Sequence, residues 1–414
     1  MRKNGVDKTL TLIEGGVCAP EGFLAGGYHC GISAYGSVTL NGGNSRDIRE
    51  DLALIKADRK YPTACAFTTA GVCGAPVIVS KYNIRHGYAS AMFCNSGIAN
   101  VLQEQGEDMA KAICFALEEK GKISRDEVVI TSTGSFAQNY PYEMVMNGIA
   151  GLVKNLGRSH EHSLAAARAM MTTDRHVKQV SYSFALGAYT CKIGAIFKGG
   201  AHVCPNMATT LCFITTDVNV SPKMLQRAFN FAVADGFNQI CIDGVSSPND
   251  TACIMASGKA GNYIVDCVDS EYRKFSYALS ETVKRICKIL VADSGKKTFS
   301  CTVSGIRSKQ LARTLSKQIV SSIAIRHSLA KGLIDPADII CLATTLSEFT
   351  HVEDIKISVK CEDTRIVISE DTGALPYQNS FQEKLKNANE IEILVAFREG
   401  NYSASAFGVL DVDI

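Results

Sequence analysis

The residues best suited to chemistry lie in one segment, residues 197–217, which reads FKGGAHVCPNMATTLCFITTD. It places Lys198, two glycines and a Pro-Asn pair ahead of Ala208 and Thr209. A threonine hydroxyl is a weak nucleophile unless a base accepts its proton, and an amino-terminal threonine supplies that base through its own α-amine. The pKa of an α-amine is about 7.7, so a useful fraction is neutral near pH 7. Thr209 is therefore a candidate nucleophile once it becomes an amino terminus.

Liberating that amine requires cleavage of the peptide bond between Ala208 and Thr209. In a strained turn the Thr209 hydroxyl can attack the preceding carbonyl, and the resulting ester then hydrolyses. Small residues such as Gly199, Gly200 and Ala208 suit a turn of this kind. The alternative is that Thr209 and Thr210 are ordinary residues that begin a strand, because threonine is common in strands.

A second candidate constellation is the run VVITSTGSFAQ at residues 128–138. A buried strand there enters a turn at Thr133 and Gly134. Such a turn can direct a backbone N–H and a hydroxyl at one point, which is what stabilisation of a tetrahedral oxyanion requires. The alternative is a simple strand-to-helix turn. Likewise Lys198 is either a surface lysine beside a glycine turn or a fixed cation, and residues 172–174 (TTD) can be read as the end of a helix.

The composition is that of a globular protein and excludes several functional classes. The chain has 414 residues, 46% hydrophobic and 20% charged, with 43 basic and 41 acidic residues. No Lys/Arg stripe with interleaved aromatics is present, so we expect no nucleic-acid partner. No apolar run reaches the ~18 residues that span a bilayer, and the first residues lack the apolar stretch of a signal peptide, so we expect a cytoplasmic protein without a membrane partner.

Cysteine and histidine spacing gives no sign of a disulfide framework or a metal site. The sixteen cysteines are scattered without a Cys-x-x-Cys pair, and we interpret them as reduced thiols in core positions. The eight histidines show no zinc-ligand spacing, so we expect no metal.

Strand-like and helix-like segments alternate along the chain, which predicts an α/β fold with layered sheets and helices. The expected strands are 51–55, 64–69, 76–80, 128–131, 211–216 and 240–242. The expected helices are 104–118, one that begins at 221–222 and ends at Gly236, one over 275–290, and 308–329. No linker divides the chain, and the one boundary that chemistry suggests is at residue 208.

The ordered segments together resemble the ornithine acetyltransferase family, also called glutamate N-acetyltransferase or bifunctional arginine-biosynthesis acetyltransferase. The matching segments are GGVCAPEGF (15–23), DLALI (51–55), AFTTAGVCGAPVIVS (66–80), CNSGIAN (94–100), EQGEDMAKA (104–112), STGSFAQNYP (132–141), MTTD (171–174), CPNMATTLCFITTD (204–217) and DGVSSPNDT (243–251). They extend almost continuously from about residue 13 to 305, and PNMAT followed by an apolar run and TTD is a specific signal.

The resemblance implies an amino-terminal-nucleophile-like α/β fold and self-cleavage between Ala208 and Thr209. The products would be an alpha chain, 1–208, and a beta chain, 209–414, which stay intertwined and pair as an α2β2 heterotetramer. It also implies a cytoplasmic enzyme of arginine biosynthesis that passes acetyl from N-acetylornithine to glutamate through an acyl-enzyme on Thr209. No metal or bound coenzyme is implied, and acetyl-CoA is a second donor only if the enzyme is bifunctional.

By the same resemblance, Thr133 and Gly134 match the oxyanion-stabilising pair. Thr172, Lys198 and Thr209 match positions that contact substrate, with Thr173 a near-equal candidate for the role of Thr172. A fixed lysine ammonium can pair with the α-carboxylate of an amino-acid substrate, and the interaction is stronger in a water-poor cleft than on the surface.

Departures from the family cluster toward the carboxyl end. Residues 293–296 read DSGK where the family has Asp-Gly-Glu-Gly, so a substrate-binding glutamate is absent, and residues 335–340 read DPADII in place of Asp-Pro-Asn-Trp-Gly-Arg. The chain stops at Ile414, before the family's last asparagine and hydroxyl contacts, and Ala137 replaces a glycine after the oxyanion turn. A pocket without these groups would favour another donor or acceptor, because specificity depends on paired polar groups.

Two alternatives therefore remain beside the acetyltransferase. One is an amino-terminal-threonine amidase or peptidase, in which water resolves the acyl-enzyme. The other is a non-catalytic relative that keeps the fold and has lost its substrate pocket.

Overall fold

The computed structural model describes residues 10–32, 49–136, 138–199, 210–346, 355–371 and 373–410. These residues form two compact units. The described parts of the first unit are 10–199, 210–233 and 246–286, and those of the second are 234–245 and 287–410. This division differs from the expected cleavage products, 1–208 and 209–414, whose boundary lies outside the described residues.

In the described part of the chain, the first unit holds a nine-stranded mixed sheet with the order β1-β6-β7-β8-β10-β3-β4-β5, in which β2 pairs with β3. Its strands are β1 (Thr11–Leu12), β2 (Phe23–Tyr28), β3 (Leu52–Phe67), β4 (Tyr88–Asn95), β5 (Val128–Ser132), β6 (Gln179–Leu186), β7 (Tyr189–Lys198), β8 (Leu211–Thr216) and β10 (Thr251–Ala256). Its helical elements are η1 (Gly16–Cys18), α2 (Ala75–Asn83), α3 (Gly106–Gly121), η2 (Arg125–Glu127), α4 (Tyr142–Lys154) and α5 (His160–Met170), and α6 (Pro222–Asp235) and α7 (Ser270–Ser294) begin in it.

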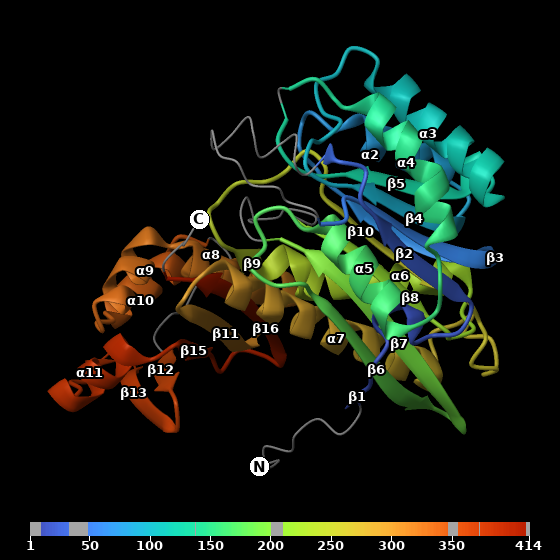
Figure 1. Ribbon diagram of the computed structural model, residues 1–414. Helices are drawn as coiled ribbons and strands as arrows, with labels where there is room; N and C mark the ends of the chain where they lie inside the picture. The colour runs from blue at the N-terminus through green and yellow to red at the C-terminus, as the bar shows by residue number, and fades with distance from the viewer. Residues whose placement is uncertain are drawn as a thin grey trace. The chain divides into compact units, whose positions relative to one another are not determined.

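The long strand β3 joins the two halves of this sheet. Its first residues pair with β2 and β4, its last residues pair with β10, and the register with β4 shifts between Lys56 and Tyr61. One core draws buried residues from β2, β3, β4, β5, β7, β8, β10 and α5. A second core lies between β3, β4 and β5 and the helices α2, α3 and α4, which cover this half of the sheet in Figure 1. The site residues lie at strand ends along this scaffold.

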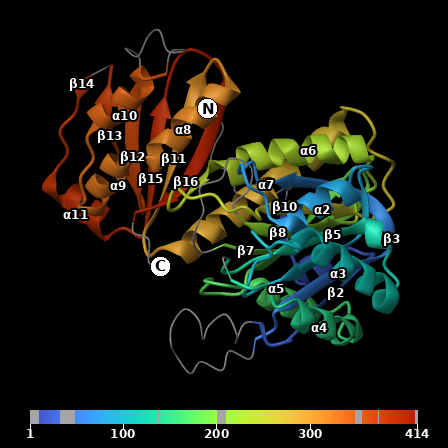
Figure 2. The same ribbon diagram turned by 90° about the horizontal axis from the view of Figure 1, so that it is seen from above.

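The second unit holds a seven-stranded sheet among the described residues, in the order β14-β13-β12-β15-β11-β16-β9. Its strands are β9 (Ile240–Cys241), β11 (Thr298–Ile306), β12 (Lys356–Cys361), β13 (Thr364–Glu370), β14 (Gly373–Ala374), β15 (Glu390–Ala396) and β16 (Tyr402–Val409). The helical elements are η3 (Phe237–Gln239), α8 (Lys309–Ser321), α9 (Ile323–Ala330), α10 (Pro336–Thr344) and α11 (Asn379–Asn387) (Figure 2). The helices α8, α9, α10 and α11 share one apolar core with the sheet.

The α/β fold is confirmed, and most expected elements are present. One prediction is wrong: residues 76–80 form part of helix α2 instead of a strand. The β-branched residues there suggested a strand, but Pro76 occupies the first helical turn, where its missing N–H costs nothing. The apolar side chains at Val77 and Val79 are buried in the helix.

Two further predictions need correction in their boundaries. The expected strands 51–55 and 64–69 are the two ends of the single strand β3. The expected helix 308–329 is two helices, α8 and α9, because the Ser322 side chain accepts a hydrogen bond from the Ile325 N–H and begins a new helix.

The described residues also show the state of the cysteines and the character of the helices. Fifteen cysteines are present there as thiols, and most are buried. Within the described ranges, no helix combines the length and the apolar character needed to cross a membrane.

Candidate functional site

The turn at Thr133 and Gly134 follows directly from the end of strand β5. The backbone N–H of Thr133 donates to the Asn95 carbonyl at 2.9 Å, and the N–H of Ser135 donates to the Gly97 carbonyl at 3.0 Å. Gly134 has φ +125°, in the region that favours glycine. A Cβ at Gly134 would lie 2.1 Å from the Gly97 carbonyl oxygen, so the turn can pack against β4 only with glycine there.

This geometry leaves one backbone donor unused. The N–H groups on either side of Gly134 are bound, whereas the Gly134 N–H has no hydrogen-bond partner among the described residues. An unpaired N–H at a fixed turn is the group that an oxyanion hole requires. Among the described residues, the Thr133 N–H is thus occupied and the Gly134 N–H is the backbone donor of this turn that remains available.

Lys198 brings a cation to the same turn from the end of strand β7. Its side chain is only 9% exposed, and its Nζ donates to Thr133 Oγ1 at 3.2 Å. A lysine ammonium can only donate, so Thr133 Oγ1 accepts in this bond and its own proton is left to donate elsewhere. The Thr133 hydroxyl and the Gly134 N–H are thus two neighbouring donors, and the positive charge of Lys198 strengthens the first of them.

Asp174 connects Lys198 to Thr172. One oxygen of its carboxylate, Oδ1, accepts from the Gly199 N–H at 2.8 Å and from Lys178 Nζ at 2.6 Å. The other oxygen, Oδ2, accepts from the Thr172 N–H at 2.9 Å. Burial by itself would raise the pKa of Asp174, but the charges of Lys198 and Lys178 and these hydrogen bonds outweigh it and lower the pKa to about 2. Asp174 is therefore ionised at neutral pH.

The turn is supported from behind by Asn95 at the end of strand β4. Its Nδ2 donates to the Ile98 carbonyl at 2.8 Å, and its Oδ1 accepts from the Tyr140 hydroxyl at 2.8 Å. Burial raises the pKa of Tyr140 far above its ordinary value, so this hydroxyl stays neutral and keeps donating. The carbonyl that binds the Thr133 N–H is thereby held in place by a buried network.

Asp250, just before strand β10, is a second buried carboxyl group near Lys198. Burial raises its pKa well above the usual range, although the Ser247 N–H and the charge of Lys198 oppose the rise. The adjacent Thr251 N–H donates to the Thr210 carbonyl at 3.1 Å, which ties β10 to the start of β8.

The structure brings together Thr133, Gly134, Thr172 and Lys198, the described members of the predicted site. Thr209 and Ala208 lie outside the described residues, as does Ala137. The flanks are described: Lys198 at the end of β7 pairs with Leu211 at the start of β8, so the segment 200–209 begins and ends on neighbouring strands.

Sequence reasoning missed the roles of Asp174, Asn95 and Asp250. Asp174 was part of the MTTD segment, and its signal was a carboxylate directly after two threonines at the end of helix α5.

The departures from the family at residues 293–296 and 335–340 lie in the second unit. Residues 335–340 begin helix α10, where the Asp335 side chain accepts from the Ala337 N–H. Of the DSGK stretch, Asp293 and Ser294 are the last two residues of helix α7, and Gly295 and Lys296 follow it.

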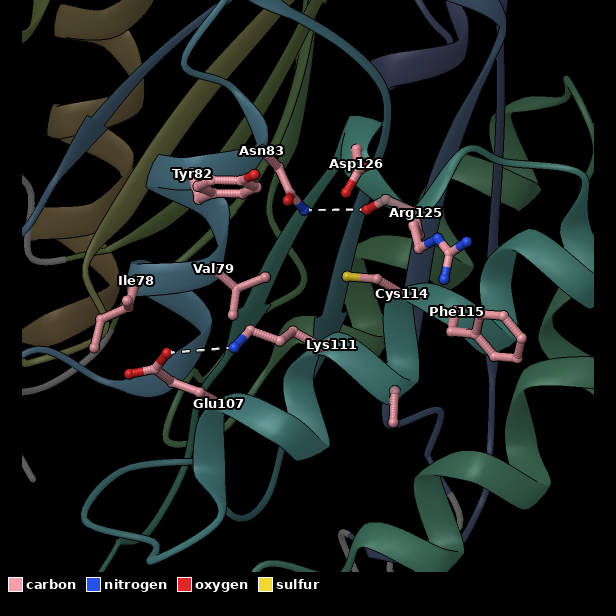
Figure 3. Close-up of a pocket in the computed structure, with 11 residues that line it drawn as sticks. Ile78, Val79, Tyr82, Asn83, Glu107, Lys111, Cys114, Phe115, Arg125 and Asp126 are labelled. Atoms are coloured by element: carbon pink, nitrogen blue, oxygen red, sulfur yellow. Dashed lines mark hydrogen bonds and ion pairs between the residues drawn. The ribbon is translucent and has the colours of Figure 1, made fainter.

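A pocket of about 770 Å³ lies elsewhere in the first unit, between α2, α3 and η2 (Figure 3). Its charged and polar groups bind each other: Lys111 lies 3.7 Å from Glu107, and Asn83 Nδ2 donates to the Arg125 carbonyl at 3.2 Å. Its one thiol, Cys114, has a pKa raised to about 12 by burial. None of the predicted site residues lines this pocket, and we assign it no role in the chemistry.

Gly134→Ala is expected to lower the free energy of unfolding by about 2–4 kcal/mol, because the methyl group meets the Gly97 carbonyl at a φ that disfavours side chains. Chemical denaturation measures the change. Gly244 also has a positive φ, +82°, but open space around it, so about 1 kcal/mol is expected for Gly244→Ala. Gly71→Ala, with open space and no positive φ, should stay within about 0.5 kcal/mol. Equal losses in all three variants would contradict the packing argument.

Comparison with known proteins gives consistent similarities. The model of the ArgJ family matches residues 37–411. The arginine biosynthesis bifunctional protein ArgJ of Lactococcus lactis subsp. lactis (strain IL1403) is 32% identical over 402 residues, covering 96% of this chain and 95% of that protein. The glutamate N-acetyltransferase of Methanocaldococcus jannaschii is 29% identical and covers 96% of each chain.

Among solved structures, ornithine acetyltransferase from Mycobacterium tuberculosis, determined with ornithine, is similar at 30% identity with a TM-score of 0.42. The alignment covers 48% of this chain and 100% of that one.

Proposed function

Because this chain belongs to the ArgJ family, we propose that it is a self-cleaving acyltransferase that moves an acetyl group from N-acetylornithine to glutamate in arginine biosynthesis. The observation that carries the proposal is the convergence of Lys198 Nζ on Thr133 Oγ1, beside the unpaired Gly134 N–H. These groups lie next to the strand ends that flank Thr209.

Self-cleavage follows from the chemistry of the threonine. The Thr209 hydroxyl oxygen attacks the Ala208 carbonyl carbon, a C–O ester bond forms, and the C–N bond breaks with the proton passing to the nitrogen. Water then hydrolyses the ester, which leaves a carboxylate on Ala208 and restores the Thr209 hydroxyl beside a new α-amine. The products are the alpha chain, 1–208, and the beta chain, 209–414.

Acyl transfer then proceeds in two steps. The α-amine of Thr209 accepts the hydroxyl proton while the oxygen attacks the acetyl carbonyl of N-acetylornithine, and ornithine departs with that proton. The amine of glutamate next attacks the acetyl-threonine ester, and N-acetylglutamate leaves. In both steps the negative oxygen of the tetrahedral intermediate is placed to accept from the Thr133 hydroxyl and the Gly134 N–H.

The electrostatics of the site favour an amino-acid substrate. Lys198 and Lys178 carry two positive charges, and the carboxylate of Asp174 carries one negative charge. The ammonium of Lys198 can therefore attract the α-carboxylate of a substrate molecule. A buried ammonium binds a carboxylate strongly because little water competes for either group. Thr172, whose backbone N–H is fixed by Asp174, is placed to contact the same substrate.

The remaining parts of the proposal come from the family. We place the enzyme in the cytoplasm, as two alpha and two beta chains, without a bound metal or coenzyme. The described cysteines, present as thiols, fit a reducing compartment. Relatives are named both bifunctional and glutamate N-acetyltransferase, so a test with acetyl-CoA as donor decides whether this enzyme makes both transfers.

The first experiment is intact mass and amino-terminal sequencing of the purified protein, followed by transfer of labelled acetyl from N-acetylornithine to glutamate. Two fragments, one beginning at Thr209, together with labelled N-acetylglutamate support the proposal. Cleavage with release of free acetate, irrespective of glutamate, indicates an amidase instead. A stable uncut chain without transfer indicates a non-catalytic relative and refutes the proposal.

Thr133→Val is expected to reduce kcat for acetyl transfer by about 10²–10³-fold, the usual cost of removing one oxyanion donor. Valine keeps the shape of threonine and loses only the hydroxyl, which accepts a hydrogen bond from Lys198 Nζ. Steady-state kinetics measures the loss. Thr133→Ser keeps a hydroxyl and should stay within about tenfold of wild type; a Thr133→Val enzyme with unchanged kcat would remove this hydroxyl from the mechanism.

A further inference from the structure

The carboxylate of Asp174 holds two stretches of chain that the proposed reaction needs together. Its Oδ2 accepts from the Thr172 N–H at 2.9 Å, on the segment that follows helix α5. Its Oδ1 accepts from the Gly199 N–H at 2.8 Å, where the chain leaves strand β7. A single carboxylate therefore joins a predicted substrate contact to the residue after Lys198.

The carboxylate is buried and remains charged. The side chain of Asp174 is completely buried, and that of Lys178 is 2% exposed. The pKa of Asp174 is about 2, since the attraction of Lys198 and Lys178 exceeds the effect of burial. An ionised carboxylate accepts hydrogen bonds at both oxygens, whereas a neutral amide of the same shape accepts at only one. Only the charged form satisfies both backbone donors.

The anchored backbone leads directly to the reacting groups. Gly199 follows Lys198, whose Nζ donates to Thr133 Oγ1 at 3.2 Å. Gly199 is also the last described residue before the segment 200–209, which contains the proposed cleavage site. A shift of about 1 Å in a positioning group can cost about 10²-fold in rate. A shift of the Gly199 N–H would therefore move both Lys198 and the point at which that segment starts.

We propose that Asp174 is a positioning residue that fixes Thr172 and the Lys198–Gly199 end of strand β7 relative to the Thr133–Gly134 turn. This inference rests on the proposed self-cleaving acyltransferase and deepens it. Asp174 does not touch the reacting atoms. It acts through the backbone of its neighbours, and so it governs both self-cleavage and substrate binding.

The simpler explanation is that Asp174 only neutralises the buried Lys178. Asp174→Asn alone cannot separate the two roles, because it leaves a buried lysine without its charge partner. The double variant Asp174→Asn/Lys178→Met removes both charges and keeps the side-chain volumes. Asp174→Glu, which keeps the charge and moves the oxygens by one methylene, serves if the double variant does not fold.

A matched control is Asp217→Asn. Asp217 is also buried in the same sheet, at the end of β8, and its Oδ1 accepts a backbone N–H, that of Lys192, at 2.7 Å. Burial raises the pKa of Asp217 to about 6, and an asparagine in its place keeps an Oδ1 that can accept from the Lys192 N–H. The control removes a buried acidic group without touching the site.

The experiment compares wild type, the double variant and the control by four measurements: thermal midpoint, fraction cleaved over time by intact mass, kcat and KM for acetyl transfer, and deuterium uptake in peptides that cover residues 172 and 199. For the double variant we expect a midpoint within roughly 5 °C of wild type, self-cleavage slower by about 10- to 100-fold, a raised KM for N-acetylornithine, and faster uptake in both peptides. The control should match wild type in cleavage, KM and uptake.

Normal cleavage, KM and uptake in a folded double variant, or in a folded Asp174→Glu protein, would overturn the inference. Asp174 would then serve only to neutralise the charge of Lys178. If wild type itself neither cleaves nor transfers acetyl, the proposed function has failed, and deuterium uptake alone decides the anchoring. Unchanged uptake at residues 172 and 199 then overturns the inference, and increased uptake supports it.

Discussion

Thr209→Ala leaves a single uncut chain of 414 residues and abolishes acyl transfer, by about 10⁴-fold or more. Alanine lacks the hydroxyl that, in the proposed mechanism, both attacks the Ala208 carbonyl and carries the acetyl group. Because one oxygen serves both steps, neither can proceed without it. Intact mass shows the absence of cleavage, and transfer of labelled acetyl from N-acetylornithine to glutamate measures the loss of turnover.

Two variants test whether this effect belongs to the Thr209 hydroxyl. Thr209→Ser keeps a hydroxyl, and we expect cleavage and transfer to persist at reduced rates. Thr210→Ala removes the neighbouring hydroxyl, which is buried without a hydrogen-bond partner among the described residues, and should leave both reactions nearly unchanged. A Thr209→Ala protein that cleaves and transfers acetyl would falsify the mechanism, whereas loss of function in Thr210→Ala alone would move the nucleophile by one residue.

Lys198→Met is expected to lower kcat/KM for acetyl transfer by about 30- to 5,000-fold. Removing one partner of a buried charged hydrogen bond costs about 2–5 kcal/mol, and here the lost partner is the proposed ligand of the substrate carboxylate. The variant also removes the ammonium that donates to Thr133 Oγ1. Both KM and kcat should therefore change, in contrast to Thr133→Val, which should act mainly on kcat.

Lys192→Met is the matched control. Lys192 lies on the same strand, six residues earlier and hence on the same face, and it is only half-buried. We expect its kcat/KM to stay within about threefold of wild type. If Lys198→Met keeps its KM for N-acetylornithine while kcat falls, Lys198 acts on the Thr133 hydroxyl alone and another group binds the carboxylate.

The candidate nucleophile, Thr209, came from the resemblance of the segment 204–217 to the family, because the local pattern alone also fits an ordinary threonine at the start of a strand. Thr133 and Gly134 were candidates by the same resemblance, because a strand followed by Thr-Gly is by itself equally typical of a simple strand-to-helix turn. Long periodic elements such as α3 and β8 were also predictable, since each has a clear apolar pattern. Residues 76–80 were not, because a short β-branched run suits either state until packing decides.

By itself, therefore, the sequence determined the family, the α/β class and the residue types available for catalysis. Only the tertiary structure decided which groups act together. That the Gly134 N–H has no partner among the described residues depends on Asn95, at the end of strand β4, and Gly97, just after it, which bind the N–H groups on either side. That Asp174 joins Thr172 to Gly199 depends on a buried carboxylate meeting donors 2 and 25 positions away in the chain. Such partners are determined by how strands pair and pack, and they cannot be predicted from the spacing of residues along the chain.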